Sequence, residues 1–108
     1  MMDWLAHDTL YERVQKFAAT QSAVVTQPVV IKPNAELTCV MTGTSAWGKI
    51  SVVVLALNKK KVMDKDIHKA LLQARGGGMP LLVLSVEPIP TKLTNAFAYL
   101  TNISFKTF

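Results

Sequence analysis

Six closely spaced cations are the residues of this sequence best suited to chemistry: Lys59, Lys60, Lys61, Lys65, Lys69 and Arg75. Lys and Arg side chains bind phosphate oxygens whatever the base sequence, so such a cluster predicts contacts with the backbone of a nucleic acid. No constellation of side chains for reading base edges is visible beside them. The competing interpretation is a solvated charged face that only favours solubility.

The net charge of +5 is concentrated in the same part of the chain. Seven basic residues lie between Lys49 and Arg75, against only two acids, Asp64 and Asp66, whereas the rest of the sequence holds five residues of each sign. One segment therefore carries the whole excess, which is the pattern expected of a surface that meets a polyanion or an acidic partner.

Residues for metal or nucleophilic chemistry are few. His7 and His68 have no neighbours at metal-ligand spacing, and Ser45 and Ser51 have no recognisable partner base. The single cysteine, Cys39, lies in an apolar run and is expected in the core. We therefore expect no catalytic residue, no bound metal and no cofactor.

The elements that position these residues follow from apolar periodicity. Helices are predicted from Asp3 to about Thr20, from Asp64 as a cap to the glycines 76–78, and from Thr91 through the apolar positions Leu93, Ala96, Phe97 and Leu100. Strands are predicted at residues 23–31, 36–42, 49–57, 81–86 and 103–106, with Pro28 restricting the first to an edge. Residues 43–48 are predicted to be a loop within an antiparallel hairpin, and strand 49–57, the second helix and strand 81–86 to form a right-handed parallel βαβ unit.

Length and composition predict a single α/β domain spanning residues 1–108, because half of the 108 residues are hydrophobic and can bury one modest core. No apolar run approaches the roughly 18 residues of a membrane span, and the N-terminus lacks the pattern of a secretory signal. The expectation is a soluble intracellular protein with no membrane partner.

This order of elements resembles the core of the restriction-endonuclease-like superfamily, which has a mixed sheet with an antiparallel hairpin, a parallel βαβ unit and helices on both faces. In catalytic members, acids at the hairpin hold a divalent metal, and a Glu/Asp-x-Lys at the end of its second strand supplies a further ligand and a lysine. Matched to that motif, Leu57-Asn58-Lys59 keeps the lysine but lacks the carboxylate.

Few acids are left to replace this carboxylate, since no Asp or Glu occurs from residue 37 through residue 63. Glu36 together with Asp64 or Asp66 is the only substitute set near the hairpin, and Mg²⁺ requires several oxygen ligands. The two aspartates are more simply explained as acids at a helix start.

Among noncatalytic proteins of this fold, the sequence is similar to the N-terminal jaw domain of the fifth subunit shared by eukaryotic nuclear RNA polymerases. The matching stretches are residues 36–40, 50–57, 61–67 and 81–85, the segment Ile89-Pro90-Thr91, and Phe108. The resemblance implies a nuclear protein without nuclease activity that lies near DNA in a complex with other subunits. Ile89-Pro90-Thr91 stands where that family usually has an aliphatic residue, Thr and then Pro, and the family continues into a C-terminal assembly domain.

The leading hypothesis is thus a noncatalytic nucleic-acid-associated module of a multiprotein complex, in the nucleus or alternatively the cytoplasm. Its predicted phosphate contacts are Lys59, Lys60, Lys61, Lys65, Lys69 and Arg75. One alternative is a divergent metal-dependent nuclease that uses Glu36 with Asp64 or Asp66. The other is a protein-interaction domain whose apolar hairpin and Trp47 pack on another subunit.

Overall fold

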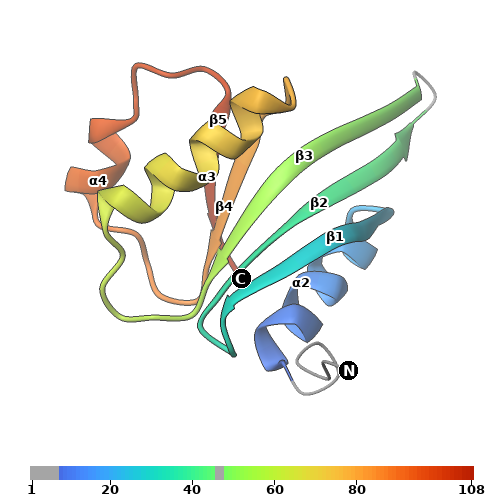
Figure 1. Cartoon of the computed structure of the whole chain (residues 1–108), viewed down its shortest axis with the longest axis horizontal. Helices are drawn as coiled ribbons and strands as arrows, with labels where there is room; N and C mark the ends of the chain where they lie inside the picture. The colour runs from blue at the N-terminus through green and yellow to red at the C-terminus, as the bar shows by residue number, and fades with distance from the viewer. Residues whose placement is uncertain (1–7, 46–47) are drawn as a thin grey trace.

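A five-stranded mixed sheet forms the centre of the molecule (Figure 1). The computed structural model describes residues 8–45 and 48–108, leaving aside the side chains of residues 44–50. In the order β1-β2-β3-β4-β5, the strands β1 (Ala23–Lys32), β2 (Glu36–Ser45) and β3 (Gly48–Leu57) are antiparallel, while β4 (Leu81–Ser85) and β5 (Ile103–Thr107) run parallel to β3. The predicted mixed α/β class, with its hairpin and parallel βαβ unit, is confirmed.

Helices cover both faces of this sheet (Figure 1). Helix α2 (Thr9–Thr20) packs on one face, and α3 (Asp64–Gly76) and the short α4 (Thr91–Ala96) lie against the other. Of the residues that the structure describes, none belongs to a helix that is both long and apolar enough to cross a membrane.

Two apolar layers hold the helices to the sheet. Side chains alternate between the faces of a strand, so neighbouring residues of β2, β3 and β4 serve different layers. The layer under α2 joins Leu10, Val14 and Ala18 to Leu37, Cys39, Met41, Val54, Ala56, Leu82 and Leu84. The layer under α3 and α4 joins Ile67, Ala70, Leu71, Ala74 and Phe97 to Val53, Leu55, Leu57, Leu81 and Val83. Every residue of β4 is buried, as its continuous apolar run predicts.

The predicted place of Cys39 in the core is confirmed. It is fully buried beneath α2, and burial raises the pKa of its thiol to about 12. The thiol is therefore protonated and packed like a small apolar group.

The central hairpin is longer than its sequence predicts. β2 and β3 pair without a break from Glu36 opposite Leu57 to Ser45 opposite Gly48, so the predicted loop is wrong at residues 43–45 and 48. Continuous cross-strand pairing outweighs the turn preference of these small residues. Trp47, the contact residue of the protein-interaction alternative, lies outside the described residues.

Helix boundaries also differ from the prediction. Met63 and Pro90 occupy the positions before α3 and α4, so Asp64 and Thr91 are the first helical residues and not the caps. The carboxylate that serves the start of α3 belongs to Asp66, whose Oδ2 accepts a hydrogen bond of 3.2 Å from the backbone N–H of Met63. The last helix ends at Ala96 and is only six residues long.

The sequence predicts that β1 lies at one edge of the sheet, but it does not predict which strand forms the other edge. β1 is an edge strand, as Pro28 predicts, and its pairing with β2 is irregular between Thr26 and Val29, where Gln27 has a φ of 52°. At the other edge, the predicted final strand pairs in parallel with β4. Two parallel connections, each containing a helix, therefore follow the hairpin.

Candidate functional site

Polar residues gather at the end of the sheet where β2 begins and β3 ends. The hairpin register sets Glu36 opposite Leu57. Asn58 then donates its backbone N–H to the carbonyl of Ala35 at 2.8 Å and its side-chain amide to the carbonyl of Asn34 at 3.1 Å. These bonds hold the chain leaving β3 against the turn between β1 and β2, which brings Lys59 next to Glu36.

Lys59 joins two carboxylates from different elements. Its Nζ lies 2.8 Å from Oδ2 of Asp66 on α3 and 3.4 Å from Oε1 of Glu36 on β2. The side chains of Glu36 and Asp66 are only 7% and 10% exposed, and that of Lys59 is 23% exposed. We call these three residues the Lys59 cluster. It ties together β2, the segment after β3 and the start of α3.

The charges within the Lys59 cluster support one another. Partial burial alone would lower the pKa of Lys59, but the hydrogen bond to Asp66 and the charges of Asp66 and Glu36 together raise it above its ordinary value. Burial alone would raise the pKa of Asp66, but Lys59, the N–H of Met63 and the charge of Lys65 together lower it. Both groups are therefore ionised near neutral pH.

The other predicted phosphate contacts lie on the surface. Lys60 and Lys61 are exposed on the segment between β3 and α3, and Lys65 and Lys69 are exposed one turn apart on α3. We call these four residues the basic surface. Among the side chains that the structure describes, none of the four makes a salt bridge. Arg75 is also exposed but lies in the last turn of α3.

The basic surface thus keeps its positive charge, whereas Lys59 does not act as a separate cation. The two acids of this segment have different surroundings: Asp66 binds Lys59, and Asp64 is exposed at the start of α3. The six predicted residues come from one continuous part of the chain, but their surroundings differ. Lys59 is paired with two carboxylates and Arg75 lies in the last turn of α3, whereas the other four form the basic surface.

Other candidate groups serve the fold. His68 contacts Phe97 edge-on with ring centroids 5.0 Å apart. Gly78 follows α3 with a φ of 67°, and its N–H donates to the carbonyl of Arg75, so the glycine run ends the helix as predicted. Within residues 8–45 and 48–108, no group of three or more His, Cys, Asp or Glu side chains is placed to hold a metal. His7 lies outside this range.

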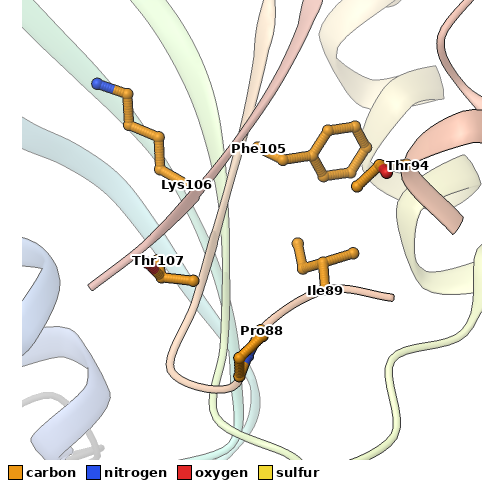
Figure 2. A pocket seen from close by; sticks show the side chains of 6 residues that line it. All are labelled: Pro88, Ile89, Thr94, Phe105, Lys106 and Thr107. Atoms are coloured by element: carbon orange, nitrogen blue, oxygen red, sulfur yellow. The ribbon is translucent and has the colours of Figure 1, made fainter. Parts of the chain in front are cut away.

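A shallow hollow lies between α4 and β5 (Figure 2). Ile89 and Phe105 point into it toward Thr94, whereas Lys106 extends from the opposite side of β5. Its lining residues are Pro88, Ile89, Thr94, Phe105, Lys106 and Thr107. Without a carboxylate, imidazole or thiol in that lining, the hollow carries no set of catalytic groups.

Sequence reasoning missed the buried carboxylate of Asp8. Its Oδ1 accepts the N–H of Tyr11 at 2.8 Å and caps α2, and its Oδ2 accepts the N–H of Asn34 at 2.9 Å. Asn34 has a φ of 60° in the turn before β2. An aspartate directly before an apolar helical pattern is a recognisable cap signal, but its second bond, 26 residues along the chain, has no sequence signal.

Comparison with protein-family models, with characterised proteins and with solved structures gave no match for this chain.

Proposed function

We propose that this chain is a noncatalytic nucleic-acid-associated module that binds the phosphate backbone through the basic surface of Lys60, Lys61, Lys65 and Lys69. The observation that carries the proposal is that these four cations are exposed on adjoining segments without a carboxylate partner among the described side chains. Such cations exchange their counterions for phosphates, which gives affinity that depends on salt more than on sequence.

A jaw-type domain of a DNA-directed RNA polymerase subunit is the specific form that we propose. The order of elements and the apolar strands that resemble that family support it. The sequence also has Leu57 where catalytic members of the superfamily have a carboxylate, which agrees with a noncatalytic domain. In this setting the module belongs to a nuclear complex, where neighbouring subunits add to the modest affinity of a few phosphate contacts.

Lys59 has a different part in this proposal from the other lysines. Its ammonium group is bound by Asp66 and Glu36, and releasing it to a phosphate would leave two poorly exposed carboxylates unpaired. We therefore propose that Lys59 fixes the segment that carries Lys60 and Lys61. Arg75 contributes only to the long-range field.

The test compares two triple variants that lose equal charge. Lys60→Ala/Lys61→Ala/Lys65→Ala removes most of the basic surface, and the control Arg13→Ala/Lys16→Ala/Lys106→Ala removes three cations from outside it. Binding to a labelled DNA duplex is measured by fluorescence anisotropy across a series of salt concentrations. Each lost phosphate contact should reduce the slope of log affinity against log salt by about 0.9.

We expect the first variant to bind more weakly and with a slope smaller by about 2 to 3, and the control to retain most of both. Equal losses in the two triple variants would show that net charge alone drives binding. Unchanged affinity and slope in the first variant would contradict the proposal outright.

A divergent metal-dependent nuclease is the second candidate, because Glu36 and Asp66 do converge with the lysine that the resemblance requires. The arrangement fits a metal poorly. Mg²⁺ favours six oxygen ligands, whereas these two carboxylates already share an ammonium group that lies 2.8 Å and 3.4 Å from their oxygens.

The nuclease candidate predicts cleavage of DNA or RNA by the purified protein with Mg²⁺ or Mn²⁺, and loss of that cleavage in Glu36→Gln and Asp66→Asn. A Lys60→Gln variant, altered next to the cluster but not in it, serves as the control. Our proposal expects no cleavage by the unaltered protein. Metal-dependent cutting that disappears only in the two carboxylate variants would establish the nuclease instead.

A further inference from the structure

A groove lies between the edge strand β1 and helix α3. Helix α3 packs on β3 and β4, which leaves part of the same sheet face beside it without a helix (Figure 1). The groove has a volume of about 320 Å³. Side chains from β1, β2, β3 and α3 line it, among them Val29, Ile31, Thr38, Leu55, Lys69 and Leu72. We call it the β1–α3 groove.

The β1–α3 groove gathers exposed apolar side chains. Val29 and Ile31 on β1 are 54% and 46% exposed, and Leu72 on α3 is 69% exposed. They are three of the seven large apolar residues that are exposed in the described part of the chain. Single exposed apolar residues are ordinary, but several that line one hollow indicate a surface that binds another molecule.

The charged side chains around the groove that are exposed to a binding partner are mainly cations. Lys69 lines it, Lys65 precedes Lys69 by one helical turn, and Lys32 directly follows Ile31. All three are exposed and make no salt bridge among the described side chains. Glu36 and Asp66 also line the groove, but they are buried and bound to Lys59. The outer charge is therefore positive.

These features select one kind of occupant. A second copy of the chain would bring the same net charge of +5, which opposes self-association. A nucleic acid would meet the lysines but would find no aromatic side chain in the lining on which to stack a base. A protein segment with apolar anchors and flanking Asp or Glu residues matches both the apolar floor and the positive rim.

We propose that the β1–α3 groove binds an acidic segment of a partner protein, whose apolar side chains contact Val29, Ile31 and Leu72 and whose carboxylates meet Lys69 and its neighbours. This site shares Lys69 with the basic surface but goes beyond the proposed phosphate contacts, since its apolar residues belong to no part of that surface. The irregular pairing of β1 around Pro28 opposes simple extension of the sheet, so recognition rests on side chains.

The experiment begins with a random 12-residue peptide library displayed on phage and selected on the immobilised protein. Enriched peptides are synthesised with a fluorescent label, and their affinity is measured by anisotropy. We expect them to contain at least two large apolar residues and a net negative charge. Leu72→Ser and Ile31→Thr should each weaken binding at least tenfold, and Lys69→Glu should also weaken it.

Tyr99→Ser is the matched control, because Tyr99 is 74% exposed but lies outside the groove. Its peptide affinity should equal that of the unaltered protein. The inference is overturned if no peptide is enriched, if the enriched peptides are basic, or if Leu72→Ser and Ile31→Thr bind as well as the control. A dimer in sedimentation that Leu72→Ser abolishes would assign the groove to a second copy instead.

The two proposals fail separately in these measurements. Leu72→Ser and Ile31→Thr should leave duplex affinity and its salt dependence unchanged, because they remove no cation. If they weaken DNA binding as strongly as peptide binding, the groove belongs to the nucleic-acid surface and the partner-protein inference is wrong.

Discussion

Lys59 is paired with two carboxylates at a position where the sequence predicts a cation free to contact phosphate. Its place in a run of three lysines predicts a phosphate contact, and its place after β3 matches a catalytic lysine in the resembling superfamily. The structure instead pairs it with Glu36 and Asp66. The absence of acids from residue 37 through residue 63 narrows its possible partners. The pairing itself depends on the hairpin register and the path into α3, which no local pattern encodes.

Removing the ammonium group of Lys59 should destabilise the protein more than removing the ammonium group of Lys60. Lys59→Met keeps the length of the apolar stem but leaves two poorly exposed carboxylates without their cation, so we expect a loss of about 1–3 kcal/mol in unfolding free energy at pH 7. Lys60→Met, at an exposed position, should change it by less than about 0.5 kcal/mol. Urea unfolding followed by circular dichroism measures both, and equal stability of the two variants would contradict the role of the Lys59 cluster.

The same pair of variants should respond to acid in a defined direction. Folding lowers the pKa of Asp66, so its stabilising contribution is present above the ordinary aspartate pKa and is lost as pH falls through the lower, folded value. Below about pH 4 the gap between Lys59→Met and the unaltered protein should therefore narrow. Folding raises the pKa of Lys59, so on the alkaline side the contribution is lost only as pH rises through that raised value.

Elements with strong periodicity were predictable from the sequence. Alternating residues in β2 and β3 face different core layers, and α3 buries Ile67, Ala70, Leu71 and Ala74 while exposing its lysines. These patterns follow from burial on one face, which each segment encodes by itself. The same segregation explains how α3 can contribute to the core, the basic surface and the β1–α3 groove at once.

Features set by neighbouring elements were not predictable in the same way. Residues 43–45 have small or hydroxyl side chains that suit a loop, but they extend β2 because β3 pairs with them. Asp64 and Thr91 are good capping residues, yet each lies one position inside its helix. The groove also depends on the distance between β1 and α3, since Ile31 and Leu72 are far apart in sequence and line the same groove only because of the order of strands in the sheet.

At the scale of the whole molecule, one sheet is shared by two apolar layers. β3 and β4 contribute side chains to both, so neither layer can form completely without the other's strands. The polar contacts at the end of the sheet add links between layers, because Asp8 joins α2 to the turn before β2 and Lys59 joins that end of β2 to α3. This arrangement predicts one cooperative unit.

Leu10→Ala and Ile67→Ala test this cooperativity from opposite faces of the sheet. Both residues are fully buried, so each truncation should cost about 2–5 kcal/mol out of a total stability of roughly 5–15 kcal/mol. Because the strands are shared, either variant should shift a single urea transition to a lower midpoint without dividing it.

Circular dichroism follows the helices and strands together, and reactivity of Cys39 with a thiol reagent follows the α2 layer alone. In Ile67→Ala the two signals should move together, since opening the α3 layer also releases the strands that bury Cys39. A Cys39 thiol that stays protected after the dichroism signal has partly been lost would mean that the layers unfold separately, and that the basic surface rests on a part of the protein that can open by itself.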